Sequence, residues 1–454
     1  GDHRDLHLSI RRQRQMCIRD RAIGESTLGP TVTGVLSLDD VSLEGKTVLL
    51  RVDVNSPINP ENMEFMDDRR FTEFLPTLDD LSSSKVVILS HQSRPGKLDF
   101  TSTEPHSKLL SKLIGRKVDF VPDVCGELAI GAIKSMRDGD ILFLNNVRMM
   151  DEENTMKKSS QEVLATSQIV RKLSGIADAY VTDAFASSHR SSPSLAGFTD
   201  EIPCIAGRLM KREINALRTA VFDPPRPYVA ILGGIKCDDS LRVARNLIQK
   251  GSVDRIAMVG VVGNLMLWAS GYDIGENNKQ FIRNSLGEAF DETWKDSEML
   301  VRDHSNLLFL PSDVAIEDNG NRRNIGIDEL PTNHPIYDIG IETMMRMRPL
   351  IMEARCLLWN GPASYFEKSD FAYGTIEIMN MFVESQGITI VGGGHTSALF
   401  NQRGKASQVS HNSTGGGAVL CMLSGDRMPV FESLERSSLK FRPLLDSLGL
   451  SSKK

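Results

Sequence analysis

Arginine and histidine side chains recur directly after several apolar runs in the first half of the chain. Residues 51–55 read Arg-Val-Asp-Val-Asn, residues 90–95 read Ser-His-Gln-Ser-Arg-Pro, and residues 145–148 read Asn-Asn-Val-Arg. Residues 183–190 begin with Asp-Ala-Phe and end in His-Arg. A guanidinium group binds phosphate and carboxylate oxygens through two parallel hydrogen bonds. Together these residues predict a small substrate that carries several negative charges.

In the second half of the chain, glycine residues follow the apolar runs instead. Residues 233–236 read Gly-Gly-Ile-Lys, residues 392–396 read Gly-Gly-Gly-His-Thr, and residues 413–417 read Ser-Thr-Gly-Gly-Gly. Helical segments follow both triple glycines, and the free N–H groups and dipole at a helix start favour negative charge. One triple glycine alone is typical of an ordinary turn, but the set predicts a phosphate cradle. The chain has no Walker-type P-loop, no protein-kinase signature and no nucleophile elbow.

Length and composition limit the classes of protein. A chain of 454 residues predicts two or three domains. A net charge of −6 offers no general attraction to nucleic acid or to an anionic membrane. The most apolar stretch, residues 256–269, is too short to span a bilayer. Six cysteines without a CxxC pair argue against a disulfide framework or a zinc ribbon, so we expect a cytoplasmic protein.

Residues 1–33 do not resemble the rest of the chain. Residues 4–21 are rich in arginine but have neither a helical nor a strand period. The acidic residues Asp2, Asp5 and Asp20 are not typical of a transit peptide, and no secretory signal is present. We expect this extension to be non-native or unstructured and to lie outside the fold.

From Thr47 onward, short apolar runs alternate with longer segments of helical period. Runs that are apolar on both faces are typical of buried parallel strands. A helix is predicted at residues 208–221, with Leu209, Ile214, Leu217 and Val221 on one side, and the proline cluster at 223–227 cannot continue it. The runs are 47–54, 86–90, 141–144, 179–182, 228–232, 256–262, 307–311, 356–359 and 388–391.

This pattern predicts two doubly wound, parallel-sheet (Rossmann-like) α/β domains joined by a helix and a hinge. Residues 34–222 form the first domain and residues 223–430 the second. Ligands of such sheets bind beyond the carboxyl ends of the strands, where the arginine and glycine motifs stand.

The motifs, in this order, resemble those of phosphoglycerate kinases, with the wording of the archaeal-type branch, across nearly all of residues 42–434. The matching stretches are 51–57, 67–70, 90–95, 144–148, 182–190, 232–236, 359–362 with Phe366 and Glu367, 392–396 and 413–418. The resemblance implies reversible phosphoryl transfer in glycolysis and gluconeogenesis, from 1,3-bisphosphoglycerate to magnesium ADP. It also implies domain closure by hinge bending, and a segment 431–454 that returns to the first domain.

The resemblance assigns the first domain to the glycerate and the second to the nucleotide. Arg70 would stabilise the transferring phosphoryl group, and Arg51 and His189 would support the residues around the 3-phosphate. The implied substrate-binding residues are Asp53, Val54, Asn55, Arg70, His91, Gln92, Ser93, Arg94, Arg148 and Arg190. The implied nucleotide-binding residues are Gly233, Gly234, Lys236, Asn360, Glu367, Gly392, Gly393, Gly394, His395 and Thr396. The implied catalytic set is Arg70, Lys236, Gly394 and Gly417, with the N–H groups of residues 415–417 meeting the phosphoryl group.

Three positions depart from the bacterial and eukaryotic pattern. Ser240 stands where a second lysine is usual, His395 where an aspartate is tied to the metal–nucleotide, and Asn145 where a glutamate is usual. A neutral imidazole is a poor ligand for magnesium, so no metal-binding residue is assigned.

Two other functions stay open on the residues alone. A catalytically silent nucleotide or anion sensor would have lost a group needed in the transition state, yet Arg70, Lys236 and both glycine stretches are present. A different acyl-phosphate-forming kinase would have changed the residues that read the glycerate. The partners we expect are therefore 3-phosphoglycerate or 1,3-bisphosphoglycerate and ADP or ATP with Mg²⁺, bound by a monomer.

Overall fold

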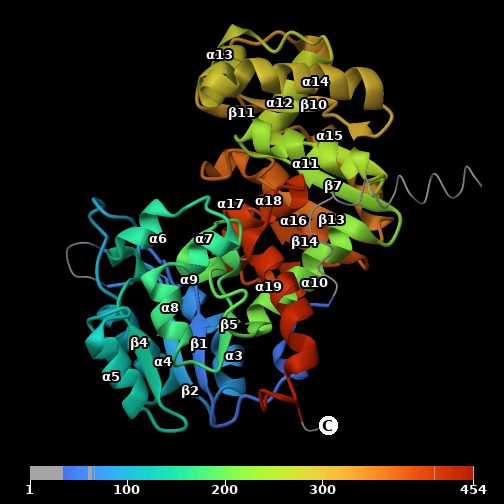
Figure 1. The fold of residues 1–454 in the computed structure, drawn as a ribbon. Helices are drawn as coiled ribbons and strands as arrows, with labels where there is room; N and C mark the ends of the chain where they lie inside the picture. Colours follow the sequence, from blue (N-terminus) through green and yellow to red (C-terminus); the bar gives the residue numbers. More distant parts are fainter. Residues whose placement is uncertain (1–33, 60–63, 66, 414, 453–454) are drawn as a thin grey trace, which may run out of the picture.

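The computed structural model describes residues 34–59, 64–65, 67–413 and 415–452. The predicted extension, residues 1–33, lies outside the described residues. The described chain forms two α/β units, each built on a six-stranded parallel sheet (Figure 1). The predicted fold class, two parallel-sheet α/β domains, is confirmed.

The first sheet has the strand order β3-β4-β2-β1-β5-β6, and each neighbouring pair is parallel. Alternate residues of a strand face opposite sides. Leu49 of β1 therefore packs in one cluster with α5 and α8, while Val48 and Leu50 pack in another with α3 and α4. Its strands are β1 (Thr47–Arg51), β2 (Lys85–Leu89), β3 (Asp119–Val121), β4 (Ile141–Leu144), β5 (Ala179–Thr182) and β6 (Cys204–Ala206). Its helices are α2 (Arg69–Thr72), α3 (Leu75–Asp80), α4 (Glu104–Ile114), α5 (Glu127–Ser135), α6 (Asp151–Thr155), α7 (Gln161–Ala165), α8 (Gln168–Ser174) and α9 (Pro193–Ala196).

The second sheet has the order β15-β14-β13-β7-β8-β9 and is also parallel throughout. Its strands are β7 (Tyr228–Leu232), β8 (Arg255–Met258), β9 (Leu308–Phe309), β13 (Cys356–Asn360), β14 (Ile388–Gly392) and β15 (His411–Asn412). Its helices are α11 (Cys237–Gln249), α12 (Gly260–Ala269), α13 (Glu276–Leu286), α14 (Phe290–His304), α15 (Ile341–Met352), α16 (Tyr373–Glu384), α17 (Gly394–Gln402) and α18 (Gly416–Ser424).

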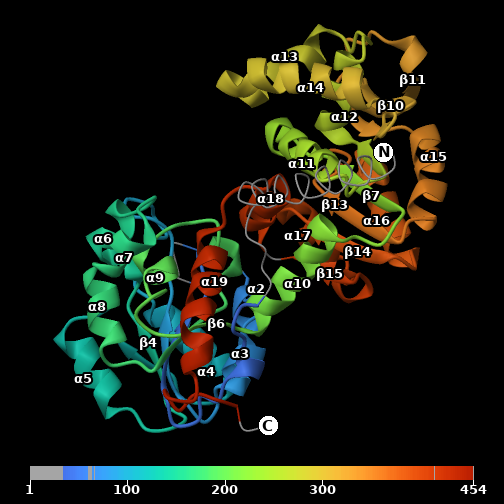
Figure 2. The same cartoon turned by 45° about the vertical axis from the view of Figure 1, so that its right-hand side comes forward.

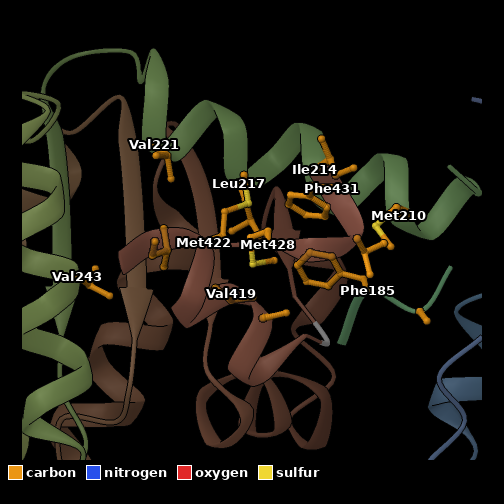
Figure 3. Packing of buried hydrophobic residues seen from close by; sticks show 14 of the residues in the cluster. Phe185, Met210, Ile214, Leu217, Val221, Val243, Val419, Met422, Met428 and Phe431 are labelled. Carbon is orange, nitrogen blue, oxygen red and sulfur yellow. The ribbon is translucent and has the colours of Figure 1, made fainter. Parts of the chain in front are cut away.

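Helix α10 (Arg208–Phe222) joins the two units and matches the helix predicted at 208–221. The residues expected on its apolar side, Leu209, Ile214, Leu217 and Val221, are all buried. Three of them, Ile214, Leu217 and Val221, pack in one cluster with Val419 and Met422 of α18 and with Phe431 (Figure 3). One hydrophobic cluster therefore runs from the first sheet through α10 to the second.

Helix α19 (Pro429–Phe441) leaves the second unit and lies along the first (Figures 1 and 2). The N–H of Cys204 in β6 donates to Oγ of Ser437 at 2.8 Å, and the N–H of Ser42 donates to the carbonyl of Leu450 at 2.8 Å. The C-terminal segment thus packs against β6, at the edge of the first sheet. The exact domain boundaries stay a prediction.

Each of the nine predicted runs contains a strand, but several runs extend beyond it: the run 47–54 contains a strand that ends at Arg51, and the run 307–311 contains only Leu308–Phe309. In the run 256–262, the strand ends at Met258, and Gly260, with φ +59°, begins α12. The short strands β3, β6 and β15 were not predicted. Nor was the three-stranded antiparallel sheet of β10 (Asp313–Asp318), β11 (Asn321–Gly326) and β12 (Ile336–Ile339).

Candidate functional site

The carboxyl ends of the strands in the first unit, here called the first half-site, carry a buried arginine–histidine pair. Arg51 ends β1, and its Nη2 donates to Nδ1 of His91 at 3.1 Å, while its Nε donates to Oγ of Ser194 at 3.1 Å. Because Nδ1 accepts, the imidazole proton lies on Nε2, and this buried nitrogen has no partner among the described residues. Burial outweighs the nearby carboxylate of Asp53 and, with the charge of Arg51, holds the pKa of His91 well below its ordinary value. His91 is therefore neutral and has one unused N–H donor.

Asp53 joins three segments of the first unit. Its Oδ1 accepts from Nη1 of Arg70 at 2.8 Å, and its Oδ2 accepts from the hydroxyl of Ser187. Burial opposes ionisation, but the charge of Arg70, the Ser187 hydroxyl and the charge of Arg51 lower the pKa of Asp53. About a third of the Arg70 side chain stays exposed, so its other N–H groups are available to a ligand.

Two further arginines enrich this end of the sheet in positive charge. Nη1 of Arg148 donates to the carbonyl of Ser93, whose N–H donates to Oδ1 of Asn55 at 2.7 Å. Burial and the neighbouring charge of Arg190 lower the pKa of Arg148 to about 10. Burial also lowers the pKa of Arg190. Cations held this close lower one another's pKa, and an anion placed among them relieves that repulsion.

Of the other predicted glycerate residues, two have side chains that face the interior. Val54 is fully buried. The amide of Gln92 is also fully buried: its Nε2 donates to the carbonyl of Ser56 at 3.1 Å, and its Oε1 lies 3.1 Å from Nε2 of His106. Val54 and Gln92 can therefore contact a substrate only through their backbone atoms. Arg94, in contrast, has an exposed side chain.

Sequence reasoning missed the carboxylate behind this cluster. Glu153 of α6 is buried and accepts from the hydroxyls of Ser192 at 2.6 Å and Ser194 at 2.7 Å. Since Ser194 also accepts from Arg51, Glu153 supports the arginine–histidine pair through one hydroxyl. An acidic residue in the run Asp-Glu-Glu-Asn gives no sign in the sequence that it is the buried one.

In the second unit, glycine at two strand ends allows a close crossing of backbones. A Cβ at Gly233, after β7, would lie 2.5 Å from the carbonyl oxygen of Pro362 and 2.8 Å from that of Gly361. The N–H of Gly234 donates to the carbonyl of Pro362 at 2.8 Å. Gly233 therefore has a packing reason to be glycine. Ser240 is buried and donates to the carbonyl of Gly233 at 3.2 Å, so it faces away from solvent.

The predicted nucleotide residues surround the starts of α11 and α17. Lys236 is exposed immediately before α11, and His395 is exposed in the first turn of α17. A Cβ at Gly393 would lie 2.8 Å from Oδ1 of Asn360, whereas one at Gly394 would meet nothing within 4 Å. The start of α17 is thus open to a ligand. The hydroxyl of Thr396 is used internally, because it accepts from the N–H of Gly361 at 3.0 Å. Glu367 is exposed, and Gly392 ends β14.

The start of α18 reaches across to the first half-site. A Cβ at Gly417 would lie 3.7 Å from Cε1 of His189, so this glycine faces the histidine beside Arg190. Nε of Arg190 donates to Nε2 of His189 at 3.3 Å. The N-terminus of an α-helix favours negative charge. A basic cluster on one unit and a helix start on the other therefore lie next to each other.

A buried carboxylate of α10 connects to the strand that leads into α18. Oε2 of Glu213 lies 2.7 Å from Nε2 of His411 in β15 and accepts from the hydroxyl of Ser413 at 2.7 Å. Glu213 is fully buried. The helix that joins the units is thus hydrogen-bonded directly to the segment that carries the last glycine stretch.

Neither a metal cluster nor a membrane-spanning helix is found in the described parts of the chain. No group of three or more His, Cys, Asp or Glu side chains there is placed to hold a metal ion. No helix among these residues is long and apolar enough to cross a bilayer.

Comparison with known proteins gives one consistent family. The family model described as phosphoglycerate kinase matches residues 38–426. A phosphoglycerate kinase of Methanobacterium bryantii is 41% identical over 408 residues, which cover 89% of this chain and 98% of that protein. One of Methanothermus fervidus is 41% identical over 403 residues, covering 88% and 97%.

Solved structures agree in fold. The crystal structure of phosphoglycerate kinase from Pyrococcus horikoshii OT3 superposes with a TM-score of 0.81 at 35% identity and covers 89% of this chain and 100% of that one. The structure of the enzyme from Coxiella burnetii gives a TM-score of 0.72 at 30% identity, covering 88% and 99%.

Proposed function

Because the chain belongs to the phosphoglycerate kinase family, we propose that its two half-sites bind the two substrates of one phosphoryl transfer. The chain catalyses the reversible transfer between 1,3-bisphosphoglycerate and ADP, which gives 3-phosphoglycerate and ATP. One observation carries the assignment to this site: Gly417, at the start of α18, approaches His189 within the basic cluster of the other unit.

The first half-site binds the glycerate. The free N–H of His91 and the guanidinium groups of Arg148 and Arg190 bind the 3-phosphate, because they form a crowded set of donors with too few counter-charges. The exposed Arg94 adds to this set. Asp53 and Asn55 orient the hydroxyl and carboxyl end of the molecule.

The second half-site binds the nucleotide. Its phosphates lie at the start of α17, where the space around Gly394 is open, and at Lys236 before α11. Asn360 contributes its amide, and Glu367 accepts from the ribose hydroxyls. Ser240 stands where a second lysine is usual and faces the interior, so we assign the contact with the nucleotide phosphates to Lys236.

The protein promotes the transfer mainly by positioning the two substrates and by neutralising the charge of the migrating phosphoryl group. Phosphoryl transfer demands little covalent chemistry from a protein, so stabilisation of the migrating group dominates. Arg70 supplies positive charge on the glycerate side, and the N–H groups of residues 415–417 supply hydrogen bonds at the start of α18. Closure of the two units about α10 brings these groups together and excludes water.

The side chains at this edge do not form a ready-made magnesium site. Magnesium prefers oxygen ligands in an octahedral arrangement. The exposed side chains at the two helix starts are an ammonium group, Lys236, and an imidazole, His395, and the neighbouring Asp239 is paired with Arg242 at 2.5 Å. We propose that Mg²⁺ arrives with the nucleotide and that the chain acts as a cytoplasmic monomer, since one chain carries both half-sites.

A coupled assay of the purified protein tests the function. The protein is given 3-phosphoglycerate and magnesium ATP, and glyceraldehyde-3-phosphate dehydrogenase converts the product with oxidation of NADH. We expect NADH loss that requires both substrates and scales with protein concentration. A protein that binds both ligands without turnover would instead be the catalytically silent sensor.

A further inference from the structure

The N-terminus of helix α10 is capped by residues that are distant in the sequence. Its own N-cap residue, Gly207, has no side chain that could accept from the first N–H groups of the helix. Oγ1 of Thr77 accepts from the N–H of Arg208 at 2.7 Å, and Oδ1 of Asp183 accepts from the N–H of Met210 at 2.9 Å. The hydroxyl of Thr77 also donates to Oδ2 of Asp183. The hydroxyl and the carboxylate therefore form one shared cap.

Glycine at position 207 is what admits this carboxylate. A Cβ at Gly207 would overlap the carboxyl group of Asp183. Both Thr77 and Asp183 are fully buried, so water does not replace either acceptor. The cap belongs to three separate segments: α3, the end of β5 and the start of α10.

The same segments carry the predicted phosphoryl-stabilising arginine. Arg70 lies in α2, and Glu73 at the end of α2 is paired with Arg212 of α10. Asp80, the last residue of α3, is paired with Arg208 at 2.5 Å. With the Thr77 bond, α2 and α3 are attached to the first turns of α10 at three points, and the three helices lie together in Figure 2.

A small cavity connects the cap to the half-site. Its lining includes Asp53 and Arg70 of the half-site together with Asp183 of the cap and Leu209 of α10. The N–H of Asp183 donates to the carbonyl of Arg51 at 2.8 Å. Asp183 is thus hydrogen-bonded directly both to the end of β1 and to the first turn of α10.

We propose that Thr77 and Asp183 are positioning residues that fix Arg70 relative to the start of α10, so that movement of this helix during closure also places Arg70. The inference rests on the proposed function. Neither side chain needs to touch a substrate. A displacement of about 1 Å at a positioned group is enough to cost up to about 100-fold in rate.

Removal of the Thr77 hydroxyl tests the cap. Thr77→Val keeps the shape but loses both hydrogen bonds, and Thr77→Ser keeps the hydroxyl. We expect Thr77→Val to lower kcat about tenfold, while the Kd values of 3-phosphoglycerate and magnesium ADP, titrated separately by calorimetry, change less than about twofold. Thr77→Ser should restore kcat to within about threefold of the parent.

Thr293→Val is the matched control. The Thr293 hydroxyl of α14 is buried and donates at 2.7 Å to the carbonyl of Ala289, the residue before this helix, remote from α10. The Thr293→Val substitution should lower the thermal midpoint without changing kcat. A Thr77→Val protein that also melts earlier but keeps its kcat would have lost only a helix cap, and the proposal would be wrong.

A surface variant covers the case in which Thr77→Val does not fold. Arg212→Gln breaks the exposed pair with Glu73 and leaves the core intact. We expect kcat to fall about threefold with little change in thermal midpoint. Unchanged kcat would overturn the proposal, whereas a parent protein that has no turnover at all would overturn the proposed function and this inference with it.

Discussion

The ring of Phe185 lies in the space that a side chain at Gly415 would need, because a Cβ there would overlap its Cε1 and Cδ1 atoms. Phe185 belongs to the 3₁₀ turn η3 (Phe185–Ser187) of the first unit, and Gly415 directly precedes α18 of the second. The same ring stacks on Phe431, with 6.2 Å between ring centroids. The contact therefore sets how closely the start of α18 approaches the basic half-site.

We predict that Gly415→Ala destabilises the protein and slows the reaction. An added methyl group in a tightly packed contact costs about 1–3 kcal/mol, and relief requires α18 to move away from η3. Urea unfolding measures the first effect and the coupled assay the second. Gly131→Ala in α5, at a glycine that also lacks a positive φ and where a Cβ would meet nothing within 4 Å, is the control for glycine replacement without a clash. Wild-type turnover in Gly415→Ala would show that this approach does not matter for catalysis.

Arg190→Ala should weaken 3-phosphoglycerate binding and leave nucleotide binding intact. The loss of one charge-assisted contact to a phosphate predicts a fall in affinity of about 10- to 100-fold. Calorimetric titration of each ligand separately measures both values. Arg302→Ala is a control on the surface of α14, where the arginine pairs only with Asp303 among the described residues. An equal loss of nucleotide affinity would contradict the division of the site between the two units.

Glu367→Gln should have the reverse effect. The exposed Glu367 is predicted to accept from the ribose hydroxyls, and an amide is a weaker acceptor than a carboxylate. We expect ADP affinity to fall about fivefold while 3-phosphoglycerate affinity is unchanged. The same titrations check it, and a selective loss of glycerate affinity would reverse the assignment of the two halves.

The buried carboxyl of Asp183 predicts a pH dependence of stability. Burial raises the pKa of Asp183 to about 7, although the N–H of Met210, the hydroxyl of Thr77 and the charge of Arg212 act in the opposite direction. Between about pH 4 and pH 7 the folded chain thus keeps a proton that the unfolded chain has released. The contribution of Asp183 to the free energy of unfolding therefore falls as the pH rises through this window and is constant above it.

Urea unfolding of the parent protein and Asp183→Asn at several pH values measures this contribution. The parent should lose stability relative to the asparagine variant as the pH rises from about 5 to about 7. A difference between the two proteins that does not depend on pH would mean that Asp183 has an ordinary pKa in the fold.

The sheet strands and the motifs at their ends could be predicted because buried parallel strands are apolar on both faces and their ends carry the polar residues. Side-chain direction could not: Gln92 adjoins His91 in the sequence, yet its amide is hydrogen-bonded in the interior to Ser56 and His106. The sequence predicts a phosphate contact at Gly233, whereas the close approach of the loops that follow β7 and β13 already requires glycine there.

The long-range contacts that support the site residues could not be predicted from the sequence either. Nothing in the sequence connects Thr77 to Arg208 or Glu153 to Arg51, because these contacts depend on the tertiary arrangement of segments that are far apart. The antiparallel sheet was harder to predict because its strand β11 is polar and largely exposed and contains Arg322, Arg323 and Asn324.

The most direct test of the account compares turnover with binding in Arg70→Ala. Arg70 is expected to act in the transition state, so the coupled assay should show kcat lowered about 1000-fold or more, with Kd values for 3-phosphoglycerate and nucleotide changed by less than about fivefold. Arg69→Ala is the matched control, because the neighbouring arginine of the same helix is paired with Asp67 at the surface. A kcat close to the parent value, or a loss confined to the Kd of 3-phosphoglycerate, would contradict the assignment of Arg70 to phosphoryl transfer.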